Sequence, residues 1–134
     1  MAEYTKINSF SEALAEGKHN FETNTLKVAL TNTAPLPTAT KLSELTDPIT
    51  SGMDTMTLVK TSSGQTAGTY KYIPADLTMT ATAEVGPFRY VVIYDDTSTD
   101  DLLVCFFDMG ASISREIGET LKLEFQEGEL FSLT

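Results

Sequence analysis

The chain has 134 residues and a formal net charge of −10, because 19 Asp and Glu outnumber 9 Lys and Arg. Its hydrophobic content of 41% is typical of a globular protein, and the length suits a single domain over residues 1–134. The negative charge argues against nucleic acid and anionic membranes as partners, because both require clustered Lys and Arg. No apolar run approaches the roughly 20 residues of a membrane-spanning helix, so we expect no membrane contact.

The N-terminal segment, residues 1–20, predicts one short helix. Ile7, Phe10 and Leu14 recur at intervals of three and four, which places them on one face of a helix over residues 6–16. We expect that face to pack against a sheet. The first residues contain no apolar stretch of the kind found in secretory signals, so we expect synthesis in a cytoplasm.

After this helix the periodicity changes to two. Thr25–Leu30 alternates apolar and other residues, which predicts a half-buried strand. Residues 31–55 contain three prolines and many Thr and Ser, and they predict a long loop with one helical turn at Leu42–Leu45. Loops of this length in small domains are often functional.

Further strand patterns follow at short intervals, and the strongest two flank a polar turn as in a central hairpin. The last two are expected to pair with each other across residues 126–128. About eight short strands, spaced too closely for helical crossovers, predict a mainly β domain: an antiparallel sandwich or barrel with one N-terminal helix. These patterns lie at Met56–Val59, Gly68–Ile73, Leu77–Thr82, Phe88–Tyr94, Leu102–Asp108, Leu121–Phe125 and Glu129–Leu133.

Few residues have the types and spacing that chemistry requires. Cys105 is the sole cysteine and lies in an apolar run, so we expect a buried thiol and no internal disulfide. His19 is the sole histidine, and without a Gly-x-Ser-x-Gly elbow it is expected to be a turn residue. The four Asp within residues 95–101 lack the spacing of a calcium loop and predict a solvated hairpin tip. We therefore expect no catalytic residue, metal, cofactor or small-molecule substrate.

Several segments together resemble a group of small virion proteins of tailed bacteriophages. They are Thr25–Pro35, Gly68–Thr78 and Gly86–Thr97, and the opening Tyr4–Phe10 with Gly17–Asn20 is also similar to the start of that group. The resemblance covers nearly the whole chain in the same order. None of its motifs is catalytic, so the resemblance concerns a scaffold.

The resemblance implies a capsid decoration (cement) protein that binds the major capsid protein on the outer surface of the virion head. It further implies a homotrimer at local threefold positions that braces adjacent capsomers. Long loops and termini can gain order against a partner, and Arg is enriched at interfaces. The candidate interface residues are therefore Tyr4, Lys6, Pro35, Leu36, Pro37, Leu42, Leu45, Arg89 and Arg115.

Two alternatives from other classes remain open. The first is a carbohydrate- or receptor-binding module at the tail or fibre. It would require exposed aromatic side chains, but the chain has no Trp and most of its Tyr lie in expected strands. The second is an enzyme, which ranks well behind because no motif points to one.

Overall fold

The computed structural model describes residues 3–125 and 130–133. It is mainly β, with 49% strand and 7% helix, and its strands form antiparallel sheets beside one short helix. The predicted fold class is thereby confirmed, although the described strands do not close into a barrel. None of the described helices is long and apolar enough to cross a membrane. The elements are β1 (Glu3–Lys6), α1 (Phe10–Ala15), β2 (Leu26–Thr31), the 3₁₀ turn η1 (Leu42–Glu44), β3 (Lys60–Thr66), β4 (Thr69–Pro74), β5 (Leu77–Thr80), β6 (Val85–Asp95), β7 (Leu102–Arg115), β8 (Thr120–Leu123) and β9 (Phe131–Leu133).

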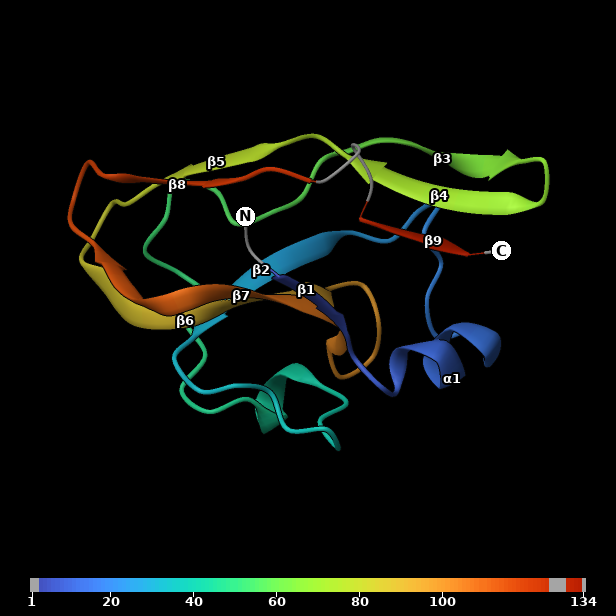
Figure 1. Ribbon diagram of the computed structural model, residues 1–134, viewed down its shortest axis with the longest axis horizontal. Coiled ribbons are helices and arrows are strands. Elements are labelled where there is room, and N and C mark those ends of the chain that lie inside the picture. Colours follow the sequence, from blue (N-terminus) through green and yellow to red (C-terminus); the bar gives the residue numbers. More distant parts are fainter. Residues whose placement is uncertain (1–2, 126–129, 134) are drawn as a thin grey trace.

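The strands are arranged in two layers. A four-stranded sheet has the order β1-β7-β6-β2, and the other layer consists of the sheets β3-β4-β9 and β5-β8. Figure 1 shows these two smaller sheets along one side of the four-stranded sheet. Along β5 and β8, Met79 and Leu121 are buried while Thr78 and Lys122 are exposed, so one face of this pair lines the core. The largest fully buried side chains are Tyr72, Phe10, Phe88, Leu26, Leu30, Met79 and Ile93.

Residues 32–48 cover the other side of the four-stranded sheet (Figure 1), and residues 52–54 go on to bond with the end of β5 in the opposite layer. The backbone N–H of Leu42 donates to the carbonyl of Asp101, and that of Leu103 donates to Thr40, both at 3.0 Å. Ala39 is buried within the segment. The helical turn predicted in this loop is confirmed as η1, and the loop is an ordered layer of the protein.

The outer edge of β2 is also occupied by its own chain. The N–H of Val28 donates to the carbonyl of Met56 at 2.8 Å, and the N–H of Leu58 donates to Leu26 at 2.9 Å. Residues 56–59 were expected to be a strand. They instead make only an isolated bridge, between Thr57 and Lys27.

The predicted helix was too long at its N-terminal end. Lys6 lies in β1 opposite Cys105, and the N–H of Ile7 donates to the carbonyl of Val104 at 3.1 Å. Ile7 and Phe10 are both buried, so both reach the core, but only Phe10 does so from the helix. Pairing with β7 prevails over the local helical pattern because it satisfies the backbone of this segment in the sheet.

Two expectations about strand pairing were incomplete or wrong. β3 was not predicted, because its sequence of Thr, Ser, Gly and Gln has no apolar alternation. β8 and β9 do not pair with each other: β8 pairs with β5, and β9 pairs with β4. The turn expected between them, residues 126–128, lies outside the described residues. Alternation along a strand identifies its buried face but carries no information about which strand lies beside it.

Gly86 is required because β7 leaves no room for a Cβ atom at this position of β6. Its φ is +128°, and a Cβ atom there would lie 2.8 Å from Cα of Ser114. We expect Gly86→Ala to lower the free energy of unfolding by about 2 kcal/mol, since it adds backbone strain to a clash with backbone. Urea unfolding measures this. Gly64→Ala is the control, because a Cβ at Gly64 meets nothing within 4 Å. Equal losses in the two variants would contradict the prediction.

Candidate functional site

The sole histidine is paired with an aspartate inside the protein. Nδ1 of His19 lies 2.8 Å from Oδ2 of Asp95, and neither side chain is exposed to solvent. His19 lies in the segment that leaves α1, and Asp95 is the last residue of β6. The pair therefore joins two segments 76 residues apart in the sequence. The expectation that residues 95–101 form a solvated tip is wrong for Asp95, which is fully buried.

Aromatic rings enclose the imidazole. His19 stacks on Phe21, with ring centroids 5.3 Å apart and an interplanar angle of 16°, and Phe10 lies 5.5 Å away. Nε2 of His19 is buried and has no hydrogen-bond partner. A proton on Nε2 would be an unsatisfied buried donor, whereas a proton on Nδ1 is shared with the carboxylate. The geometry therefore places the proton on Nδ1.

Asp95 accepts further hydrogen bonds from the residues around it. Nδ2 of Asn24 donates to Oδ2 at 2.7 Å, and the N–H groups of Thr97 and Ser98 donate to Oδ1 at 3.0 and 3.2 Å. Burial opposes ionisation of this carboxyl, but the hydrogen bonds from His19 and Asn24 outweigh burial and lower its pKa. Asp95 is thus an ionised, saturated acceptor that fixes the start of the β6–β7 turn.

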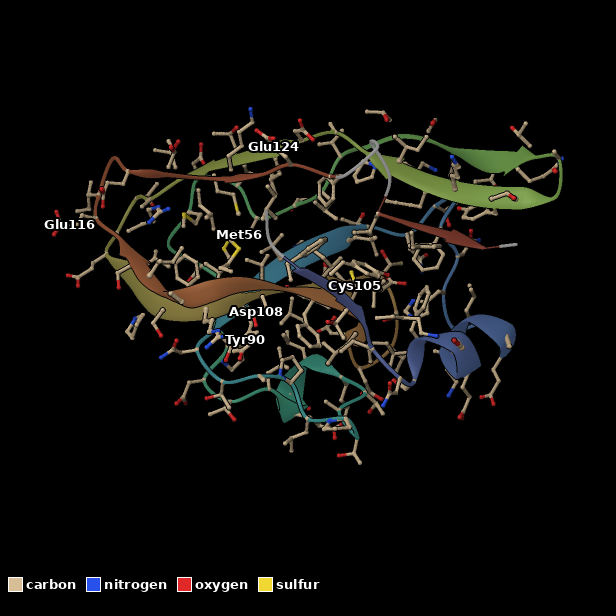
Figure 2. All side chains as sticks on the ribbon, in the orientation of Figure 1. Met56, Tyr90, Cys105, Asp108, Glu116 and Glu124 are labelled. Carbon is tan, nitrogen blue, oxygen red and sulfur yellow. The ribbon has the colours of Figure 1, made fainter. Side chains whose placement is uncertain are left out.

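This arrangement can hold loops together but offers little to a substrate. None of the described residues donates a hydrogen bond to Nε2 of His19, so no nucleophile is aligned with the pair. Cys105 is completely buried (Figure 2), and burial raises the pKa of its thiol. The part of the chain that the structure describes contains no group of three or more His, Cys, Asp or Glu side chains placed to hold a metal ion.

A shallow depression of about 460 Å³ lies beside this pair, lined by polar residues that include Asn20 and Asn24. Most of these groups already bond to the protein itself. Oγ1 of Thr97 accepts from the N–H of Thr25 at 2.9 Å, and Oγ of Ser98 donates to the carbonyl of Asp95 at 2.6 Å. The polar atoms that line the depression therefore hold the β6–β7 turn in place through hydrogen bonds within the chain.

The candidate interface residues of the N-terminal segment and the long loop lie in adjacent parts of the fold. Tyr4 and Lys6 are on the edge strand β1, and Nδ2 of Asn8 donates to the carbonyl of Pro37 at 3.2 Å, which ties this segment to the loop. Tyr4 is 39% exposed and Leu36 is 64% exposed.

The remaining loop candidates differ in their exposure. Pro35 and Leu42 are half-buried, Pro37 is exposed, and Leu45 is buried in the core of its own chain. We use the term contact surface for Tyr4, Lys6 and residues 35–37, that is, the exposed members of this set together with Pro35, which adjoins Leu36.

The two candidate arginines lie elsewhere and are bound within the chain. The guanidinium of Arg89 donates to both carboxylate oxygens of Asp108, at 2.8 and 3.1 Å, and lies over the ring of Tyr90. Figure 2 shows Tyr90 and Asp108 on the same side of the sheet. Arg115 donates to the carbonyl of Thr120 at 2.7 Å and so closes the connection between β7 and β8.

The buried His19–Asp95 pair was not recognised from the sequence. A signal existed: Asp95 directly follows the continuous apolar run Val91–Tyr94, and the burial of that run extends to it. Comparison with known proteins finds no matching family model, no matching curated protein and no matching solved structure.

We expect Asp95→Asn to lower the free energy of unfolding by about 3 kcal/mol, because it removes one partner of a buried, hydrogen-bonded pair. Chemical unfolding at neutral pH measures the loss. The control is Asp96→Asn: this neighbouring carboxylate is exposed and makes only a surface ion pair with Lys27, so its loss should be within about 0.5 kcal/mol. Similar effects of the two substitutions would rule out a special role for the buried carboxylate.

The pKa shift of Asp95 also predicts acid sensitivity. The pKa of Asp95 in the folded chain lies below the ordinary value of 3.8, so ionised Asp95 stabilises the fold fully above that value. This contribution is lost as the pH falls through the folded pKa. The difference in unfolding free energy between wild type and Asp95→Asn should therefore shrink below about pH 4. Unfolding curves from neutral to acidic pH measure it, and a difference that stays constant would contradict the assignment.

Proposed function

We propose that the chain is a non-enzymatic structural protein of a bacteriophage virion, a decoration protein that binds the major capsid protein on the outer head surface. In this proposal it forms a homotrimer and strengthens the contacts between capsomers. The observation that carries the proposal is the position of the segments that resemble phage virion proteins. They build β2, β4 and β6 and the start of β5, which belong to both layers, and the contact surface lies beside that frame.

The buried His19–Asp95 pair supports a role in binding more than one in catalysis. It is the one acid–imidazole pair of the described residues, and its hydrogen bond links the segment after α1 to the end of β6, where the β6–β7 turn begins. The protein then acts through its surface. A surface that must be held in one shape benefits from rigid loops, because ordering them on binding would cost affinity.

The contact surface fits a weak, repeated contact. Leu36 offers an exposed apolar side chain from a segment that is tied to the sheet by backbone hydrogen bonds. Each copy needs only modest affinity, because many copies on one shell act together through multivalency. Closed symmetry, such as that of a trimer, is the general preference of homo-oligomers. The net charge of −10 would keep decorated particles from associating with one another.

The location is tested by immunogold electron microscopy of intact virions with an antibody against this chain. Label spread evenly over the head would support decoration. Label confined to the tail or its tip would overturn it in favour of receptor or carbohydrate binding, and absence from purified virions would overturn the virion role altogether.

The contact surface is tested by rebinding the purified chain to particles that lack it. We expect Leu36→Asp to weaken binding at least ~tenfold, because a buried unpaired charge costs more than 1.4 kcal/mol. Ile117→Asp is the matched control, since Ile117 is 73% exposed but lies in the connection between β7 and β8. It should bind as the wild type does. Equal weakening by both substitutions, or none by Leu36→Asp, would contradict the assignment of this surface.

A further inference from the structure

The loop that carries Leu36 is anchored at two points. From the segment before α1, Nδ2 of Asn8 donates to the carbonyl of Pro37 at 3.2 Å. Five residues further along the loop, the N–H of Leu42 donates to the carbonyl of Asp101 at 3.0 Å. Asp101 stands where the β6–β7 turn runs into β7. The position of Leu36 therefore depends on two other segments, the one around α1 and the β6–β7 turn.

The buried pair joins these same two segments to each other. Asn8 precedes α1 and His19 follows it, while Asp95 begins the β6–β7 turn and Asp101 ends it. In Figure 1 the three segments lie near one another, at the end of the four-stranded sheet that faces α1. We use the term junction for the three contacts that connect them: His19 with Asp95, Asp101 with Leu42, and Asn8 with Pro37. Together the three contacts form a closed circuit.

Each segment of the junction is also ordered along its own length. In the turn, the N–H of Ser98 donates to Oδ1 of Asp95 at 3.2 Å, and Oγ of Ser98 accepts from the N–H of Leu102 at 3.0 Å. In the N-terminal segment, the aromatic side chain of Phe10, the first residue of α1, lies 5.5 Å from that of His19. A displacement at the buried pair is thus carried to both anchors of the loop through hydrogen bonds and packed side chains.

We propose that His19 and Asp95 are positioning residues for the contact surface. Their hydrogen bond completes the junction, so each of its three contacts is supported by the other two, and the junction opens as one local unit. Leu36 then meets its partner on a loop that is already ordered, which reduces the entropy lost on binding. The inference rests on the proposed function only in taking Leu36 as a point of contact, because the junction is internal to the chain.

Asp95→Asn tests the junction from the inside. An Asn side chain has one acceptor oxygen where Asp has two, so it cannot accept from both His19 and the turn. The amides of Leu42 and Leu103 report on the loop, because they donate to Asp101 and to Thr40. We expect the hydrogen exchange of these two amides, measured by NMR on the purified chain, to become at least ~tenfold faster.

Gly86→Ala is the matched control for a general loss of stability. It is expected to lower the free energy of unfolding by a similar amount, but Gly86 lies at the opposite end of β6 from Asp95. Amides that exchange through a local opening do not follow the global free energy of unfolding. Gly86→Ala should therefore change the exchange of the Leu42 and Leu103 amides less than ~threefold.

Asn8→Ala tests the junction from the surface. Asn8 is exposed, so its loss does not disturb the core, and circular dichroism checks that each variant is folded. The N–H of Thr97 donates to Asp95, on the far side of the junction. If the three contacts open together, Asn8→Ala should make the exchange of the Thr97 amide at least ~threefold faster.

Faster exchange in Asp95→Asn and Asn8→Ala, without the same change in Gly86→Ala, would support the proposal. Unchanged exchange in either junction variant, or equal acceleration by Gly86→Ala, would overturn it. If Asp95→Asn does not fold, the comparison of Asn8→Ala with Gly86→Ala decides alone. Because no capsid is present, a failure of the proposed virion role would leave this result unaffected.

Discussion

The fold depends on covering a strand that is apolar on both faces. From Val91 to Tyr94 every residue of β6 is buried, although successive side chains point to opposite sides of the sheet. Such a strand requires a layer on each side. The sheets β5-β8 and β3-β4-β9 supply one, and residues 32–48 supply the other. The long proline-containing segment is therefore a structural layer, and only its outward residues are free to meet a partner.

The same strand ends in a buried carboxylate, and this changes the role of the turn that follows. A buried charge is tolerated only when hydrogen bonds replace water. Asp95 obtains them from a histidine, an amide side chain and two backbone N–H groups. These donors come from the segment after α1 and from the turn itself, so a single carboxylate fixes both. Charge and apolar packing act together here. The apolar strand β6 places Asp95 in the protein interior, and the hydrogen bonds of Asp95 fix the positions of the segment after α1 and of the β6–β7 turn.

The sequence was most informative where local chemistry decides the structure. The apolar strands β2, β6 and β7 were predicted because burial selects their residues directly, and the turn η1 was predicted although none of its residues is buried. The start of α1, strand β3 and the partners of β8 and β9 were not, since each depends on contacts with residues far along the chain. The candidate site shows the same limit. That Cys105 would be buried followed from its neighbours, whereas Asp95 resembled the exposed acids beside it until its partner His19 was placed.

The burial of Cys105 gives this protein an internal reporter. Its thiol lies in the central sheet opposite Lys6 of β1, is fully inaccessible, and is held protonated by its surroundings. A thiol reagent can reach it only when the sheet opens, because the thiolate is the reacting species and needs solvent. The rate of labelling therefore measures how often the centre of the molecule opens under native conditions. Since 134 residues contain one cysteine, that rate refers to a single place in the fold.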